Sequence, residues 1–397
     1  MALRVNTVRN GSGHLGGHHC ARVLFGACAG WRDYHDHRRH RVSGADAICT
    51  SLQRIDIVST RSALPIYLVL LLIVCLLSLR FGAVEVAWSD VFNITSETPN
   101  ANTQVILDYR LPRTVAAIVI GSYLALSGLV FQTVLRNPLA DPTMFGVSGG
   151  AAFAVVAAMS LAIYLFPVGE SLQVATSYLP MAVVPVIALV GSLSATALVF
   201  WLAWDRGFSP LRLVLIGVVL AAVLNGIVMA MVLTLSETRT ELAILWLAGS
   251  LYARDFSNVL PALPWGVAAI SAIVILSPQL SALRFDPQTA ASMGVATRTL
   301  APVLLGIAAC LAASAVSIAG PIGFVGLIVP HLARLIARPT IAAQILSCLF
   351  IGAILVVASD TVGRAVAAPL EVPVGIVTSL LGAPVFAFLI RAQAKRI

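Results

Sequence analysis

The chain has 397 residues, of which 59% are hydrophobic and only 11% are charged, with a mean hydropathy of +0.95. Soluble domains carry about 25% charged residues, so this composition excludes an ordinary soluble globular protein. The formal net charge is +8, but the basic residues form no patch with interleaved aromatic side chains, so we expect no nucleic-acid partner.

Residues 1–60 differ from the rest because they are polar and rich in arginine, glycine and histidine. Two short tracts, around His18 and His35, have a composition that can bind metal. We favour the simpler interpretation, a disordered cytoplasmic extension or translated sequence ahead of the true start. We predict no signal peptide here, since the first long apolar run begins near Leu64. No metal or cofactor is expected anywhere in the chain.

Residues 61–397 contain repeated apolar runs of about 20 residues, the length a helix needs to cross a hydrocarbon core. This pattern predicts an all-α polytopic membrane protein that is surrounded by lipid. The ten predicted spans lie near 64–81, 113–135, 142–165, 180–204, 210–235, 261–283, 300–318, 322–337, 341–359 and 374–391. A short amphipathic piece at 240–252 is expected to lie at an interface.

The basic residues in the short loops predict the orientation, because cytoplasmic loops carry an excess of Lys and Arg. With the N-terminus inside, most basic residues fall in cytoplasmic turns and most acidic residues fall outside. Arginines such as Arg110 and Arg364 are outside in this arrangement and weaken the bias. Both termini are therefore predicted to be cytoplasmic.

Two kinds of chemistry are missing from the sequence. Lys395 is the only lysine, whereas a P-loop needs a lysine directly after its glycine-rich turn. We therefore predict that the chain is not an enzyme and does not hydrolyse ATP by that route. The centres of the predicted spans contain no Asp, Glu, Lys or Arg, and Gln132 and Asn225 are their strongly polar residues. Since ion-coupled carriers use intramembrane ionisable residues, such a carrier is only a remote alternative.

An internal repeat is indicated by two segments, Asp141–Gly146 and Gly320–Gly326, which each open a small-residue helix after a proline. Five predicted spans separate these segments, so they face opposite ways across the membrane. An inverted repeat would produce this arrangement, as transporter folds commonly do.

The densest motif is RLPRTVAAIVIGSYLALSGLVFQTVLRNPLADPTMFGVSGG, residues 110–150. Its apolar run stops at Arg136, and two prolines break the helix before the chain re-enters apolar sequence. Together with GPIGFVGLIVPHLAR at 320–334 and EVPVG at 371–375, it resembles the integral-membrane subunits of type II ABC importers for iron-siderophores, haem and vitamin B12. The resemblance covers roughly residues 64–391.

The resemblance implies a BtuC-like permease with ten spans in the inner membrane of a bacterium. It implies a dimer with a second copy or a similar chain, two ATP-binding subunits inside, and a substrate-binding protein outside. Ferric siderophore is the expected substrate, and haem and cobalamin are alternatives that use the same architecture.

The resemblance also implies roles for particular residues. A cytoplasmic gate would include Asn137, Leu139 and Ser209, although a helix-breaking turn without gating is the alternative. Arg110, Arg113 and Arg364 would dock the binding protein, unless they only anchor helix ends among lipid headgroups. The remaining motif residues are structural: Pro138, Pro142, Gly146, Pro321, Gly326, His331 and Arg334. For His331 we expect a hydrogen bond at a helix terminus, because one histidine without a second ligand is a poor metal site.

Residues 284–299, RFDPQTAASMGVATRT, form the largest polar interruption on the predicted cytoplasmic side. Asp286 can cap a short helix through Thr289 to Met293, and Gly294 can end it. The segment resembles the family's coupling loop, which seats in the ATPase; an ordinary loop between helices is the alternative. The coupling residues would be Asp286, Thr289, Ser292, Met293, Gly294 and Arg298.

Overall fold

The computed structural model describes residues 60–82, 84–92, 100–165, 183–204, 209–235, 237–368 and 370–394. The predicted N-terminal extension lies outside these residues except for Thr60, where the first described helix begins. Every regular element in the described residues is a helix, which confirms the all-α class.

Seven helical stretches of the described residues are long and apolar enough to cross a membrane by length and composition. The helices that form them are α3 (Thr60–Arg80), α6 (Leu111–Val134), α9 (Val184–Ala203), α10 (Pro210–Val232), α13 (Ala262–Ile275), α16 (Thr297–Ala319) and α18 (Ile341–Val366). Three shorter apolar helices complete the set: α7 (Val147–Leu165), α17 (Val325–Ile336) and α19 (Val374–Ala394). Each of the ten predicted spans thus has its helix.

Short helices connect or extend the spans. They are α4 (Trp88–Phe92), α5 (Ala101–Gln104), the π-helix η1 (Val105–Arg110), the 3₁₀ helix η2 (Pro142–Phe145), α11 (Glu237–Leu247), α12 (Phe256–Val259), α14 (Ser277–Ala282) and α15 (Pro287–Ser292). The predicted amphipathic piece corresponds to α11. The predicted span 261–283 is divided at Leu276 into α13 and α14, because Pro278 has no backbone N–H to continue the helix.

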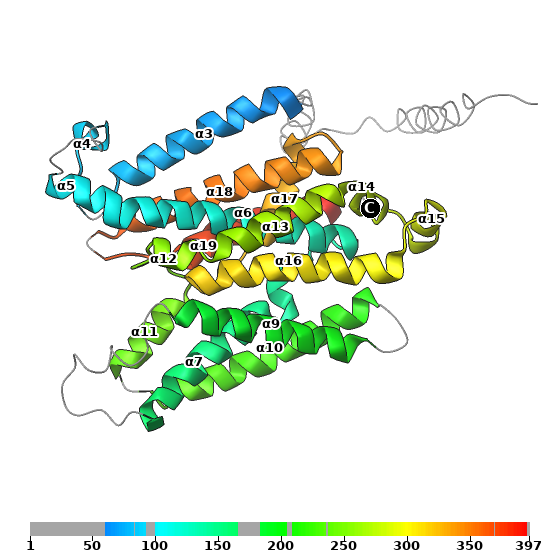
Figure 1. Ribbon diagram of the computed structural model, residues 1–397, viewed down its shortest axis with the longest axis horizontal. Coiled ribbons are helices and arrows are strands. Elements are labelled where there is room, and N and C mark those ends of the chain that lie inside the picture. The colour runs from blue at the N-terminus through cyan, green and yellow to red at the C-terminus, as the bar shows by residue number, and fades with distance from the viewer. Residues whose placement is uncertain are drawn as a thin grey trace, which may run out of the picture. The chain divides into compact units, whose positions relative to one another are not determined.

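The core lies around α6 and α16 (Figure 1). In the most apolar 18-residue stretch of each span, 83% of the residues are buried for α6 and 72% for α16. The corresponding share is only 17% for α3, α10 and α13. Helix α6 contacts α16, α17 and α18, while α7, α9 and α10 pack on one another and reach α16. The peripheral helices therefore keep apolar faces that are available to lipid or to another chain.

Glycines let the central helices approach closely. A Cβ on Gly121 of α6 would lie 2.2 Å from the carbonyl oxygen of Gly352 in α18, and one on Gly128 would lie 1.9 Å from that of Gly326 in α17. No side chain fits at such distances, so backbones contact each other directly. Small residues serve this purpose in membrane helix packing, where dispersion contacts rather than hydrophobic exclusion hold helices together.

The contacts confirm the predicted inverted repeat. Spans α3 to α10 form one set and spans α13 to α19 form the other, and α6 and α16 are the second span of each. Helix α6 packs on α17 and α18, just as α16 packs on their counterparts α7 and α9. The turns before α7 and α17 each use a glycine with positive φ, Gly146 at 80° and Gly320 at 78°.

Candidate functional site

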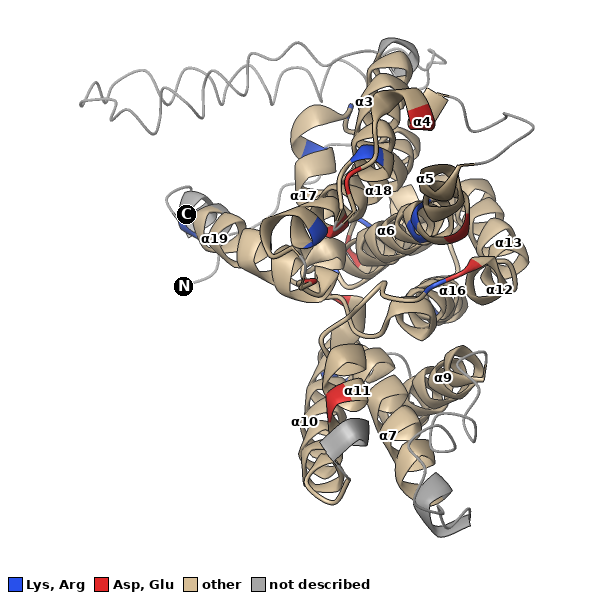
Figure 2. Ribbon diagram, turned by 90° about the vertical axis from the view of Figure 1, so that its left-hand side faces the viewer, with Lys and Arg blue, Asp and Glu red and all other residues tan. Residues whose placement is uncertain are grey.

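Two ends of the helices carry polar networks, which we name the Arg113 end and the Arg136 end after residues at the two ends of α6. In Figure 2, charged residues gather where α5, α6, α12 and α18 terminate, whereas the helix shafts are mostly uncharged. This first cluster is the Arg113 end.

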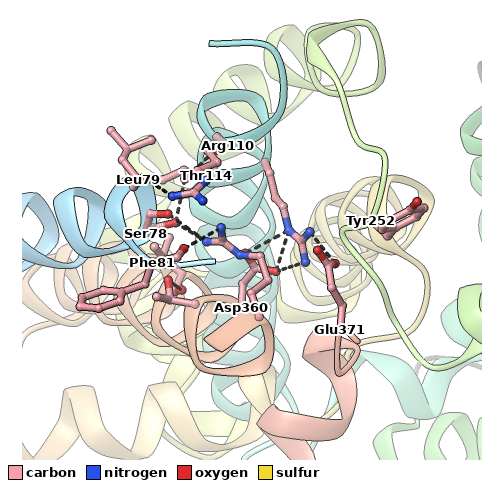
Figure 3. A network of polar contacts seen from close by, with 12 residues as sticks. Ser78, Leu79, Phe81, Arg110, Thr114, Tyr252, Asp360 and Glu371 are labelled. Atoms are coloured by element: carbon pink, nitrogen blue, oxygen red, sulfur yellow. Dashed lines mark hydrogen bonds and ion pairs between the residues drawn. The ribbon is translucent and has the colours of Figure 1, made fainter. Parts of the chain in front are cut away.

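At the Arg113 end, a buried carboxylate joins two arginines (Figure 3). Asp360 is 2% exposed and accepts from Arg113 at 2.8 Å and from Arg364, one turn further along α18, at 3.0 Å. Arg113 also pairs with Glu371 at 2.7 Å. The network ties the start of α6 to the end of α18 and to the segment before α19.

Arg110 caps the end of α3. Its guanidinium donates to the carbonyl oxygens of Leu79 at 2.6 Å and Arg80 at 2.9 Å, and also to that of Val84. The carbonyls of Leu79 and Arg80 belong to the last turn of α3, and the last turn of any helix leaves its acceptors free. Cationic side chains are favourable there since they also complement the helix dipole.

Arg364 completes this cap from the other side. It donates to the hydroxyl of Ser78 at 2.8 Å, to the Ser78 carbonyl at 3.1 Å and to the Phe81 carbonyl at 3.1 Å. The structure therefore brings Arg110, Arg113 and Arg364 together, but their guanidinium groups bond within the chain, and the three residues are 5%, 9% and 3% exposed. Their docking role stays a prediction.

The predicted span that ends at residue 359 left Arg364 outside the helix, and this boundary was wrong. Helix α18 continues past the predicted end at residue 359 to Val366. The span was predicted to end before Asp360 because a charged residue usually ends an apolar run. In the structure Asp360 pairs with two arginines, so it can remain inside the helix. The i, i+4 spacing of Asp360 and Arg364 was the signal that could have revealed the extension.

At the Arg136 end, α6 stops in a tight turn that contains the predicted gate. Arg136 has a positive φ of 51°, and the Asn137 side chain accepts from the amide of Leu139 at 2.9 Å. Leu139 is 38% exposed. Asp141 ends the turn by accepting from the amide of Thr143 at 2.8 Å and so starts η2. Burial raises the pKa of Asp141, while its hydrogen bonds from Thr143 oppose that shift.

Helix α17 is attached to this turn. A ring nitrogen of His331, which lies within α17 rather than at its end, is 3.1 Å from the carbonyl oxygen of Pro138. Arg334 donates to the side-chain oxygen of Gln132, whose nitrogen donates to the carbonyls of Gly326 and Leu327 at 3.2 and 3.1 Å. Gln132 was noted in the sequence only as a polar residue, since no local signal identifies its partners.

The segment after α14 forms the short helix that its residues predict. The Asp286 carboxylate accepts from the amide of Thr289 at 3.2 Å and from its hydroxyl at 2.6 Å, and both bonds hold the pKa of Asp286 below its usual value. Gly294 ends the helix with φ 83°. Apolar side chains are exposed on either side of α15, with Phe285 at 53% and Met293 at 58%.

Hydrogen bonds connect this segment to the turn after α6 and to the segment between α17 and α18. The guanidinium of Arg136 donates to the Phe285 carbonyl at 3.0 Å, and Arg284 donates to the Pro339 carbonyl at 2.8 Å. Burial lowers the pKa of Arg284. A cavity of about 200 Å³ is lined by Arg136, Phe285, Arg298 and also Pro210, which follows the predicted gate residue Ser209. The predicted coupling residue Arg298 thus shares this cavity with chain neighbours of the predicted gate residues Asn137 and Ser209.

Comparison with known proteins gives concordant matches. Residues 70–392 match the FecCD transport family. The achromobactin transport permease CbrC of Dickeya dadantii is 34% identical over 84% of this chain and 93% of its own length. The iron(3+)-hydroxamate import permease FhuG of Bacillus subtilis is 33% identical over 81% and 94%. The cobalamin import permease BtuC of Halobacterium salinarum is 35% identical over 75% and 76%.

One solved structure has the same fold. It is described as an inward-facing conformation of a metal-chelate type ABC transporter, and it aligns with a TM-score of 0.71 at 28% sequence identity. The alignment covers 84% of this chain and 99% of that one.

Proposed function

We propose, from the premise that this chain belongs to the FecCD transport family, that it carries a ferric siderophore through the inner membrane of a bacterium in an ATP-driven importer. Family membership makes the chain a permease subunit of a type II ABC importer for iron-siderophores or related substrates. A ferric siderophore is supported as the substrate because the chain matches permeases for achromobactin and ferric hydroxamate over nearly their whole length. Cobalamin is the second candidate, because one relative is a cobalamin permease.

We place the Arg136 end in the cytoplasm, where two ATP-binding subunits would contact α15. The exposed apolar residues Phe285 and Met293 support this, since they lie beside a polar, well-capped helix outside the spans and need a partner surface. Both termini are then cytoplasmic. Asp286, Thr289, Ser292, Gly294 and Arg298 complete the surface that the ATPase would contact.

The proposed gate is the turn at Asn137 and Leu139 together with Ser209. Its support is proximity: Arg136 in that turn donates directly to the carbonyl of Phe285 at the start of the coupling segment. A movement of α15 driven by nucleotide binding would therefore pull on the gate. Closure by small and apolar side chains suits a large substrate that keeps its own iron ligands.

We also propose that the chain works as a dimer with the pathway between two permease subunits. Asn225 supports this, because it is an exposed amide within the apolar stretch of α10 that follows Arg212, and this helix is largely unburied. An amide that faces hydrocarbon without a hydrogen bond costs about 2–7 kcal/mol. A water-filled pathway between subunits removes that cost.

The binding protein would dock at the Arg113 end, outside the cell. Arg110, Arg113 and Arg364 are part of this docking proposal, and their bonds to α3 and α18 would also hold the docking surface in shape. Charged groups at such a rim mainly steer and orient the partner.

Uptake by intact cells tests the substrate. A deletion strain complemented with the wild-type chain would be given radioactive iron as a citrate, hydroxamate or catecholate chelate, and in parallel labelled haem and cobalamin. The proposal expects uptake of one ferric siderophore to depend on the chain. Dependence of cobalamin uptake alone would replace it with the second candidate.

A further inference from the structure

The cavity at the Arg136 end lies where three spanning helices end. Its wall includes the last residue of α6, Val134, and the first residues of α10 and α16, Pro210 and Thr297. All three helices belong to stretches that are long and apolar enough to cross a membrane. The cavity therefore lies at the level where the spans leave the hydrocarbon core and enter the headgroup region.

Two arginines line this cavity, and no acidic residue of the described chain does. Arg136 donates to the Phe285 carbonyl through one nitrogen, so the rest of its guanidinium is available. Arg298 is exposed, and its side chain bonds to none of the residues that the structure describes. Asp286 follows Phe285 in the chain, but it does not line the cavity, and its carboxylate accepts from Thr289. The charge of the cavity wall is thus positive.

The rest of the wall is apolar apart from Thr297, and it includes Leu283, Phe285, Ala290 and Ala301. Inorganic phosphate would gain nothing from these side chains, whereas an amphiphile with an anionic head matches both parts of the wall. A volume of about 200 Å³ admits the headgroup of such a molecule but not its acyl chains.

A headgroup in the cavity would leave part of the coupling surface free. Pro287 and the buried Ala290 are the residues of α15 that line the cavity. Ser292, at the end of α15, and Met293, which follows it, are exposed and do not line it. These two residues therefore remain available to the ATPase when the cavity is filled.

We propose that this cavity binds the phosphate of an anionic phospholipid of the inner leaflet, with Arg136 and Arg298 as the donors. Guanidinium groups bind phosphate oxygens through paired N–H donors, and basic pockets between spans on the cytoplasmic side hold anionic headgroups. The assignment to the inner leaflet rests on the proposed orientation of the chain. The bound headgroup would join the turn after α6 to the start of α16, and so connect the proposed gate with the coupling segment.

The test is native mass spectrometry of the complete permease–ATPase complex after its lipids have been removed in detergent. The complex would be titrated with phosphatidylglycerol, which is anionic, and with phosphatidylcholine, which carries the same phosphate without net charge. Each bound lipid is resolved by its mass, which gives a Kd for the first lipid. Arg298→Gln and Arg136→Gln each remove a proposed donor, and the control Arg338→Gln removes an exposed arginine that does not line the cavity. Thermal unfolding would show that each variant is folded.

We expect the wild-type complex to bind phosphatidylglycerol about 25-fold more tightly than phosphatidylcholine, since each arginine near an anionic headgroup contributes about fivefold. Arg298→Gln and Arg136→Gln should each weaken phosphatidylglycerol binding about fivefold, and Arg338→Gln should leave it unchanged. Equal affinity for the two lipids, or an equal loss in all three variants, would overturn the inference.

Two further outcomes would assign the cavity to another occupant and also overturn the inference. Displacement of phosphatidylglycerol by an equal concentration of inorganic phosphate would show a site for a free anion. A preference for phosphatidylglycerol in the isolated permease that disappears in the complex would show that the ATPase fills the cavity. Since the titration measures no transport, a failure of the proposed substrate would be seen separately in the uptake assay.

Discussion

Replacing Asp360 with asparagine tests the network at the Arg113 end. The variant keeps the shape of the side chain but removes the charge that Arg113 and Arg364 share at 2.8 and 3.0 Å. Removing one partner of a buried ion pair costs about 3–5 kcal/mol, because the other charge stays buried. Glu371 still pairs with Arg113, so Arg364 suffers most, and we expect a loss of about 3 kcal/mol in unfolding free energy.

The matched control is Glu371→Gln. The Glu371 side chain is 26% exposed and pairs with Arg113 at 2.7 Å, so its loss should cost only about 1 kcal/mol, as for an ion pair near the surface. Both variants would be unfolded with increasing denaturing detergent, and the unfolding free energies compared with wild type. A cost for Asp360→Asn equal to or below that of Glu371→Gln would refute the idea that Asp360 is the centre of the network.

Four further predictions concern packing, coupling and pH dependence. Gly121→Ala places a methyl group 2.2 Å from the carbonyl oxygen of Gly352, so detergent unfolding should show a loss of about 1–3 kcal/mol, and wild-type stability would contradict the close approach. Arg136→Gln removes the bond to the coupling segment, so uptake should fall in proteoliposomes while ATP hydrolysis continues; proportional loss of both would argue against a link to the gate. Asp286→Ala removes the cap of α15, and ATPase co-purification should weaken. Because the pKa of Asp286 is lowered, that cap is complete at neutral pH and is lost as pH falls below the usual carboxylate range, so ATPase binding in the wild type should weaken only there.

The spans and α15 could be predicted because their signals are local. Apolar run length sets a span, and an Asp before the helix and a Gly after it set α15. The break at Leu276 also had a local signal, which is Pro278. We predicted one continuous span because the apolar run continues past this proline.

The polar networks could not be predicted, since their partners are far apart in the chain. Arg113 and Asp360 are separated by 247 residues, and Arg136 and Phe285 by 149. Nothing near Arg113 in the sequence indicates that its guanidinium turns inward, because helix packing decides which residues it meets.

Transport by the reconstituted complex is the most direct test of the proposed ATP-driven import. The chain would be incorporated into liposomes with its ATPase, with the binding protein and a radioactive ferric siderophore on one side and ATP on the other. We expect uptake that needs both ATP and the binding protein. Uptake driven by an ion gradient without ATP would contradict it.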